Sequence, residues 1–320
     1  MRQLALLAVI ALYCGCSTGI SKRDEDSSRI DTARAAVDRG EYASALQIAQ
    51  PLAQHGFAPA QTLLAEMYLD GQGVARDPAR AMSLYRQAAD QGDGRAENGI
   101  GLMYDTGNGV ALNYQEAFAW YTKAAQRGYP GGINNLGTMY AKGLGVEWNE
   151  PQATALYEKA AALGYVTAQL NLGTRFVSGD EVTQDCARGM AWYNKAASEG
   201  SAQAEYEIGS LYEKAQCVPR DMSMAADWLL KASEHRHAMA MNNLGILYQK
   251  GDGVRRDLVI AYALYTVSAT LDSSGDNYAL GNVVKIEGKM SDDQLRAGQD
   301  LAKALSQDGK FREVLAKAAQ

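Results

Sequence analysis

The sequence predicts an all-α protein, an α/α solenoid of stacked helix-turn-helix repeats that winds as a right-handed superhelix. One segment recurs six times at a spacing of 36 residues, which gives units at 57–92, 93–128, 129–164, 165–200, 201–236 and 237–272. The eighteenth position of every unit is valine, and the twelfth is tyrosine or phenylalanine. A fixed period of this length is typical of solenoids, in which each repeat packs mainly against its neighbours.

Each unit predicts a helix, a turn, a second helix and a stop. Ala168, Leu172 and Phe176 recur at spacings of four residues and place one buried face on the first helix. A Gly-x-Gly-Val segment then ends that helix, because glycine tolerates the positive φ of a helix C-cap. The Asp or Asn three residues after the valine is the predicted N-cap of the second helix, which ends at a further glycine.

This pattern resembles the Sel1-like repeats, which are relatives of the tetratricopeptide repeats. The second unit carries it in Ile100-Gly101, Tyr104, Gly107, Gly109-Val110, Ala117, Trp120-Tyr121 and Lys123-Ala124-Ala125. The resemblance covers residues 57–272 and implies the fold. It says little about function, because one fold serves many functions.

Both ends of the repeat array are predicted to be caps, because the open face of a terminal repeat is apolar. Residues 30–56 are interpreted as a degenerate helix pair. Residues 273–320 are interpreted as C-terminal capping helices, one of them capped by Ser291. The fifth unit is the predicted weak joint, because Ala215, Cys217 and Arg236 stand where other units have glycine.

The first residues predict export. Residues 1–16 contain Arg2, a short apolar run and the junction Gly15-Cys16, which together indicate a signal peptide with a bacterial lipobox. Cys16 is the predicted lipidation site, and the serine after it resembles the outer-membrane sorting pattern. A plain secreted protein is the alternative, because Tyr13 and Cys14 are unusual upstream of a lipobox. The predicted location is the periplasm, on the outer membrane, with residues 17–29 as a flexible tether.

Two further cysteines, Cys186 and Cys217, lie in adjacent repeats. Cys186 follows the N-cap Asp185, and Cys217 replaces the second glycine of the next turn. Stacking places both at one edge of the solenoid, and an oxidising compartment favours a disulfide between them. The alternative is a reactive thiol at a helix N-terminus.

Enzyme signatures are scarce in this chain. A net charge of −6 with mixed signs argues against nucleic-acid binding. The sequence has no Ser-x-x-Lys or His-Glu-x-x-His motif, and its one Gly-x-Ser-x-Gly match, at residues 15–19, lies at the predicted lipobox. His235 and His237 are interpreted as solvated turn residues. Trp120, Trp192 and Trp228 share one repeat position and are interpreted as packing residues. We therefore expect no catalysis, no cofactor and no metal.

A series of polar residues occupies first-helix positions that the buried face leaves unused. In solenoids related to tetratricopeptide repeats this face lines the concave groove, so the series is the predicted partner-binding site. The alternative is that its asparagines tie neighbouring helices together through hydrogen bonds. The series consists of Arg95, Asn98, Asn134, Asn135, Asn171, Glu207, Asn242 and Asn243.

The predicted function is non-enzymatic binding of a protein partner by a monomeric, lipid-anchored solenoid. The resemblance implies that the partner is a toxin effector or an envelope protein. In the first case the chain is an immunity protein against a phospholipase effector of type VI secretion. In the second it is a scaffold for envelope assembly or polysaccharide export. A hydrolase of the β-lactamase kind is a third and weaker alternative.

Overall fold

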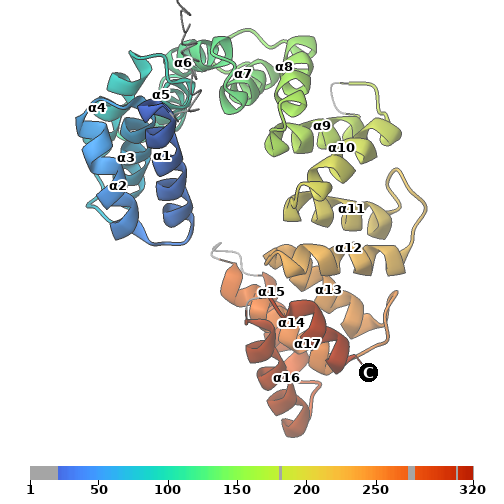
Figure 1. Cartoon of the computed structure of the whole chain (residues 1–320). Coiled ribbons are helices and arrows are strands. Elements are labelled where there is room, and N and C mark those ends of the chain that lie inside the picture. Colours follow the sequence, from blue (N-terminus) through green and yellow to red (C-terminus); the bar gives the residue numbers. More distant parts are fainter. Residues whose placement is uncertain (1–20, 180–181, 273–277, 308, 320) are drawn as a thin grey trace, which may run out of the picture. The chain divides into compact units, whose positions relative to one another are not determined.

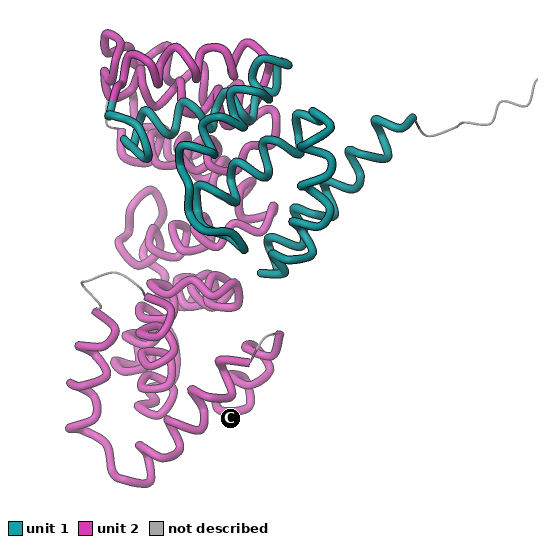
Figure 2. The backbone as a smooth tube through the Cα atoms, turned by 90° about the vertical axis from the view of Figure 1, so that its left-hand side faces the viewer, with its two compact units in different colours: residues 1–112 teal, residues 113–320 magenta. Residues whose placement is uncertain are grey.

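The computed structural model describes residues 21–179, 182–272, 278–307 and 309–319 (Figure 1). Within these ranges the structure contains 17 helices and no strand. The chain divides into two compact units, residues 1–112 and residues 113–320 (Figure 2). In the repeats of each unit, helices that follow one another in sequence pack together. The protein is therefore an all-α helical repeat solenoid, as the 36-residue period predicts.

Unit 1 contains the N-terminal helix pair and the first helices of the repeat array. Its helices are α1 (Lys22–Asp38), α2 (Tyr42–Gln54), α3 (Ala58–Asp70), α4 (Pro78–Ala89) and α5 (Gly94–Thr106). Unit 2 contains the rest of the array and the C-terminal helices. Its helices are α6 (Tyr114–Gln126), α7 (Pro130–Lys142), α8 (Glu150–Ala162), α9 (Val166–Ser178), α10 (Cys186–Ser198), α11 (Ala202–Lys214), α12 (Met222–Glu234), α13 (Ala238–Lys250), α14 (Leu258–Leu271), α15 (Tyr278–Glu287), α16 (Asp292–Leu305) and α17 (Phe311–Ala318).

The second helix of each repeat begins at the predicted Asp or Asn. The Asp77 carboxylate accepts a hydrogen bond from the backbone N–H of Arg80 at 2.9 Å. The Asn149 amide oxygen accepts one from the N–H of Gln152 at 3.1 Å. These caps satisfy N–H groups that have no partner within the helix. The same cap is present at Asn113, Asp185, Asp221 and Asp257.

A glycine on the first helix sets the distance between the two helices of a repeat. A Cβ atom at Gly173 would lie 2.6 Å from the ring of Tyr193, which is 2% exposed. A Cβ atom at Gly245 would lie 2.8 Å from the ring of Tyr265. Such distances are far inside van der Waals contact, so the small residue in the predicted buried face is what admits the ring.

In the third and sixth repeats, the second glycine of the turn packs against the preceding repeat. A Cβ atom at Gly145 would lie 2.3 Å from the carbonyl oxygen of Tyr114, the first residue of α6. A Cβ atom at Gly253 would lie 2.2 Å from the carbonyl oxygen of Met222, the first residue of α12. The turn of one repeat thus rests on the start of the second helix of the repeat before it. A side chain at this position would separate the two repeats.

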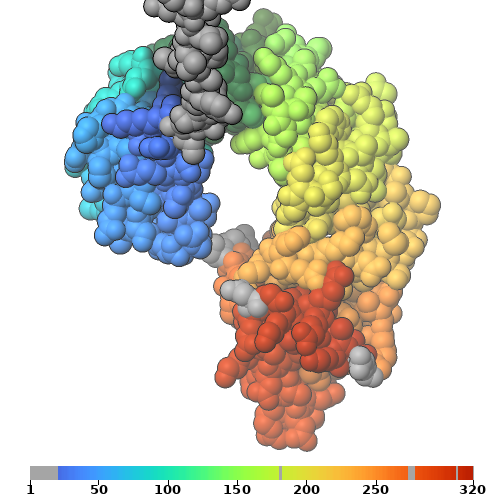
Figure 3. All heavy atoms as spheres, in the orientation of Figure 1, coloured from blue at the N-terminus to red at the C-terminus, as the bar shows by residue number. Residues whose placement is uncertain are grey.

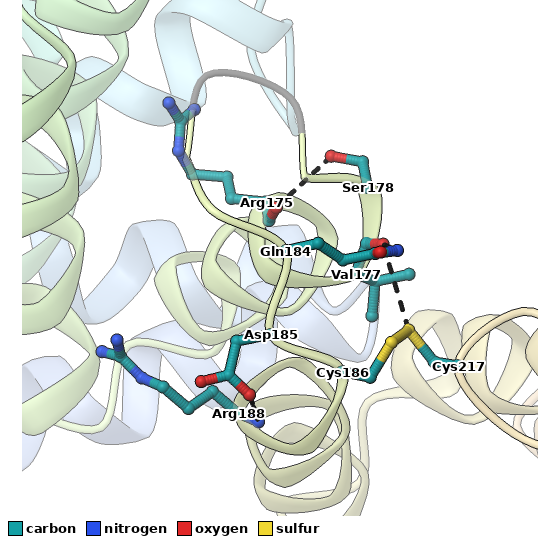
Figure 4. Close-up of a disulfide and its surroundings, with 8 residues drawn as sticks. All are labelled: Arg175, Val177, Ser178, Gln184, Asp185, Cys186, Arg188 and Cys217. Atoms are coloured by element: carbon teal, nitrogen blue, oxygen red, sulfur yellow. Dashed lines mark hydrogen bonds between the residues drawn. A yellow bond between two sulfur atoms is a disulfide. The ribbon is translucent and has the colours of Figure 1, made fainter.

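In the fifth repeat a disulfide replaces this glycine contact. Cys217 stands at the position of the second turn glycine and bonds to Cys186, the first residue of α10, with the two Cα atoms 5.1 Å apart (Figure 4). Of the two alternatives for these cysteines, the structure contains the disulfide. The bond joins the same two chain positions that touch at Gly145 and Gly253.

The fifth repeat also has an irregular backbone. In the described part of the chain, positive φ values outside glycine occur at Ala215 (56°), Cys217 (65°) and Arg236 (60°). A left-handed conformation costs an ordinary residue roughly 1–2 kcal/mol. A disulfide that closes a loop of about 30 residues stabilises by roughly 3.5 kcal/mol in the chain-entropy account. The covalent bond therefore offsets much of the backbone strain in the predicted weak joint.

The N-terminal helix corrects one prediction from the sequence. Residues 17–29 were expected to be a flexible tether, but α1 begins at Lys22. Ser21 and Asp24 form a reciprocal capping box that starts the helix, and Ile30 lies in the buried core of unit 1. The first two turns of α1 are mostly exposed to solvent and consist of polar residues. This polar composition is also typical of a linker, which is why the sequence alone predicted a tether.

The predicted signal peptide and Cys16 lie outside the described residues. Among the described helices, none has both the length and the apolar character needed to cross a membrane.

The C-terminal helices cover the end of unit 2, where α16 and α17, in red, lie against the orange sixth repeat (Figure 3). Ser291 and Gln294 form the capping box that starts α16, as predicted. In α17, Phe311 and Leu315 are buried in one apolar cluster with residues of α12, α13 and α14. The Arg312 guanidinium forms two hydrogen bonds with Glu234 of α12, at 2.5 and 2.9 Å.

We predict that Cys186→Ser destabilises the protein more than Cys217→Gly, although both remove the same disulfide. Cys217→Gly restores the turn glycine and relieves the positive φ, which returns roughly 1–2 kcal/mol. Cys186→Ser leaves the unbonded Cys217 side chain at the position where the third and sixth repeats have glycine. Urea unfolding of the two variants measures the difference, and equal losses of unfolding free energy would contradict this account of the joint.

Candidate protein-binding surface

Two adjacent positions on each first helix of unit 2 carry the predicted polar series. The residues at these positions are Asn134 and Asn135 on α7, Leu170 and Asn171 on α9, Tyr206 and Glu207 on α11, and Asn242 and Asn243 on α13. Leu170 and Tyr206 were not part of the predicted series. We call five of these partly exposed residues, Asn135, Asn171, Tyr206, Glu207 and Asn243, the first-helix surface. They lie on successive first helices and are spaced by the repeat period.

Hydrogen bonds between amides link these helices in steps. Asn171 of α9 donates from Nδ2 to Oδ1 of Asn134 on α7 at 2.9 Å. Asn282 of α15 donates from Nδ2 to Oδ1 of Asn242 on α13 at 2.8 Å. Asn243 of α13 is hydrogen-bonded to the Tyr206 hydroxyl of α11. The alternative interpretation is therefore correct for these residues, because they tie neighbouring helices.

Two of the predicted groove residues are not available to a partner. Asn98 of α5 and Asn134 of α7 are 8% and 3% exposed. Their assignment to a binding groove is wrong, because the period identifies a helix face but not how deeply the next repeat covers it. Asn134 instead serves as the acceptor for Asn171.

Arg95 belongs to unit 1 and is exposed, but it is held in an ion pair. Its guanidinium contacts the Glu66 carboxylate of α3 at 2.6 and 3.2 Å. Arg34 of α1 binds the same carboxylate at 3.0 Å. This cluster ties three helices of unit 1 and commits Arg95 to contacts within that unit.

The amide links stop at one point, between α9 and α11. Here Leu170 occupies the position of Asn134, where the other repeats have a hydrogen-bonding residue. Glu207, at the position of Asn171, therefore has no amide acceptor or donor at the Leu170 position of α9 to bond with. The Glu207 carboxylate instead accepts a hydrogen bond from Gln203 of its own helix at 2.6 Å. Burial, and then the carboxylates of Glu207 and Glu213, raise the pKa of the neighbouring Tyr206. Glu207 is thus a half-exposed negative charge within a row of neutral amides.

His237 is not the solvated turn residue expected from the sequence. Its Nδ1 accepts a hydrogen bond from the backbone N–H of Ala240 at 3.1 Å and so caps α13. Its Nε2 therefore carries the proton and donates to Gln203 at 3.0 Å. The ring also stacks on Tyr206 at 4.8 Å between centroids. Burial lowers the pKa of His237, so this neutral form is favoured.

His235 also has a specific partner. Its Nδ1 lies 2.9 Å from the carboxylate of Glu205 on α11, and the Glu205 side chain is 7% exposed. The histidine reaches this carboxylate from the end of α12. Both histidines at this repeat boundary thus contact the first helix of the fifth repeat.

The tryptophans of the second helices contact cations of their own helices. The ammonium groups of Lys123 and Lys231 lie 3.7 Å from the ring centroids of Trp120 and Trp228. Lys195 lies 5.3 Å from Trp192 in the same arrangement. Each pair is separated by three residues on one helix, so these contacts are local to the helix. Trp228 also packs against an apolar cluster, as the packing interpretation predicts.

The buried tyrosines are poorly suited to acid–base catalysis. Burial raises the pKa of Tyr193 to about 12 and that of Tyr265 to about 12. Both phenols are therefore protonated at neutral pH and act as hydrogen-bonding core residues. The Tyr193 hydroxyl is hydrogen-bonded to the Thr174 hydroxyl at 2.9 Å. Within the described ranges, no three His, Cys, Asp or Glu side chains are grouped so that they could hold a metal ion.

Sequence reasoning missed a cavity at the C-terminal end of this surface. The cavity has a volume of about 610 Å³ and is lined by Met239, Asn242 and Asn243 of α13 together with Tyr278, Asn282 and Lys285 of α15. Helix α15 follows the last repeat, so the 36-residue period contains no signal for its residues. Only Asn242 and Asn243 were identifiable in advance.

The fold and this surface define the class of the protein as a tandem helix-pair solenoid that presents side chains from successive first helices. The Sel1 repeat pattern matches residues 58–93, 94–129, 130–165, 166–201, 202–237 and 238–273. The chain therefore belongs to the Sel1 repeat family, whose repeats mediate protein–protein interaction. Each matched range starts one residue after the predicted unit, at the first helical residue instead of its N-cap.

Solved structures of other repeat proteins share this fold. The Sel1 repeat protein of Oxalobacter formigenes is 28% identical, with a TM-score of 0.66 over 76% of this chain and 100% of that chain. The immunity protein PA5088 of Pseudomonas aeruginosa is 24% identical, with a TM-score of 0.51 over 68% of this chain and 83% of that chain. The comparison with curated proteins found no match.

We predict that neutral His237 makes stability depend on pH. Burial lowers its pKa below the ordinary value of 6.5, so its stabilising contribution is complete above pH 6.5. As the pH falls from there through the lower folded-state pKa, the unfolded chain takes up the proton first and the contribution is lost. The control is His237→Ser, because Ser201 caps α11 at the same repeat position without titrating.

The measurement is urea unfolding at pH 7.5 and 5.5. The wild type should lose more unfolding free energy than His237→Ser between these two values. His55 and His235 are present in both proteins and cancel in the comparison. The same loss in both proteins would show that His237 does not set the pH dependence.

Proposed function

We propose that this chain is a non-enzymatic binding protein that holds a protein partner on the first-helix surface of unit 2. The observation that carries the proposal is the half-exposed Glu207 carboxylate within a row of amides on helices that are fixed to one another. The amide links and the disulfide hold the surface in one arrangement before binding. A preorganised surface loses less conformational entropy when a partner binds.

The charge of the chain points to the electrostatic character of the partner. The net charge is −6, and the partly exposed Glu207 and Glu213 both lie on α11. Complementary charge accelerates encounter and fixes the register of a complex more than it adds affinity. We therefore expect the partner segment that meets α11 to be basic.

We further propose that the partner is a secreted phospholipase toxin and that the chain is an immunity protein. The predicted export signal and lipidated Cys16 support this role, because the inhibitor would stand on the outer membrane in the compartment where such a toxin acts. The similarity to the immunity protein PA5088 is one of fold. An envelope scaffold uses the same surface with a different partner, and the experiment below separates the two.

We predict that Glu207→Lys weakens capture of the partner by at least about tenfold, equivalent to roughly 1.4 kcal/mol. The matched control is Asp227→Lys, which changes the net charge equally at an exposed position on the second helix α12. Tagged full-length variants are crosslinked in envelope extracts, and the retained proteins are quantified by mass spectrometry. The partner is the protein that the wild type and Asp227→Lys retain and Glu207→Lys loses.

The identity of that protein decides between the roles. Purified chain that blocks lipid hydrolysis by the captured protein supports immunity, whereas capture of an envelope protein without toxic activity supports the scaffold. Equal capture by all three baits would refute the assigned surface. Hydrolysis of a chromogenic β-lactam by the purified protein would refute the non-enzymatic function.

We predict that Cys16 carries the membrane anchor. Cells labelled with radioactive palmitate should incorporate label into the wild type and none into Cys16→Ser, because the acyl chain requires the Cys16 sulfur. Cys14→Ser is the control for the neighbouring cysteine and should remain labelled. Label that persists in Cys16→Ser would refute the lipoprotein assignment.

A further inference from the structure

The cavity between α13 and α15 has the features of a peptide-binding site. Its volume is about 610 Å³, and its lining combines amides, apolar side chains and one ammonium group. Met239 and Tyr278 are 58% and 77% exposed, and both line it. Single exposed apolar residues are ordinary on a protein surface, but here two large ones meet at one cavity with Ile246.

The amides on its wall retain hydrogen-bonding capacity. Asn282 donates to Asn242, and Asn242 donates to Asn243 at 3.3 Å. Each of these amides has a second N–H, and the Asn282 carbonyl has no partner among the described residues. An extended peptide backbone offers an N–H and a C=O at each residue and can use both kinds of group.

The charge of the cavity selects among peptides. Lys285 lines it from α15, is exposed and has no anionic partner within the described part of the chain. Asp272 is the other charged lining residue and already has an interaction partner of its own. The cavity therefore offers one uncommitted positive charge, which a carboxylate complements.

We propose that this cavity binds an extended segment of the protein partner in which an apolar side chain is next to an acidic one. The apolar side chain lies against Met239 and Tyr278, the backbone pairs with Asn282, and the carboxylate meets Lys285. The inference rests on the proposed function, since it names a second contact on the same surface. With the Glu207 carboxylate on α11 and the Lys285 ammonium on α15, the two contacts have opposite charge and fix the direction of the partner.

The experiment is selection from a library of random dodecapeptides whose carboxyl ends are fused to the phage coat protein. Selection on the full-length protein should enrich sequences with an apolar residue beside Asp or Glu. Their affinity, measured with the fluorescein-labelled peptides, should fall at least about tenfold on Lys285→Glu. A peptide whose Asp or Glu is replaced by Lys should recover binding to Lys285→Glu.

The matched control is Lys289→Glu, which makes the same charge change at an exposed residue just beyond α15 that does not line the cavity. It should bind the selected peptides as the wild type does. The proposal is overturned if no sequence is enriched over a selection on Lys285→Glu, or if Lys289→Glu loses binding equally. It is also overturned if the labelled peptides bind with a free carboxyl end but not when that end is an amide.

These outcomes are independent of the test of the proposed function. Partner capture that depends on Glu207, with no peptide enriched at the cavity, rejects only the peptide site. Peptides that bind at Lys285, with partner capture indifferent to Glu207, reject the assigned first-helix surface and leave the cavity as a separate site.

Discussion

The joint between the turn of one repeat and the start of the preceding second helix is the constraint on which the rest of this structure depends. At Gly145 and Gly253 the backbones approach so closely that no side chain fits between them. At the Gly253 joint, this approach brings α13 near enough to α11 for Asn243 to reach Tyr206. Without it, the first-helix surface would be a set of separate helices and not one arranged row.

The disulfide holds the same kind of joint, between the turn of one repeat and the second helix of the repeat before it. Where the fifth repeat has lost its turn glycine, Cys217 and Cys186 meet at the two positions that otherwise touch. The bond maintains the joint although the backbone at Cys217 has a positive φ. A sequence irregularity and its compensation thus occupy the same place, next to the α11 helix that carries Glu207.

Local rules in the sequence predicted most of the fold. Valine, glycine and Asp or Asn at fixed positions specified the turns and caps, because each acts through its own backbone conformation or hydrogen bond. The exposed start of α1 was missed, because a capping box at Ser21 and Asp24 outweighs a linker-like composition. The site was less predictable, because the period placed Asn134 on the right helix face but did not reveal that the next repeat buries it. Asn282 and Lys285 lie beyond the period altogether.

The central claim is that the first helices of unit 2, and not the second helices, contact the partner. Photo-crosslinking in living cells tests it most directly, with a benzophenone amino acid placed at Asn135 or Glu207 and, for comparison, at Asp227. The account predicts a covalent adduct with one partner from the two first-helix positions and none from Asp227. Adducts that form from Asp227 and not from Asn135 or Glu207 would contradict it.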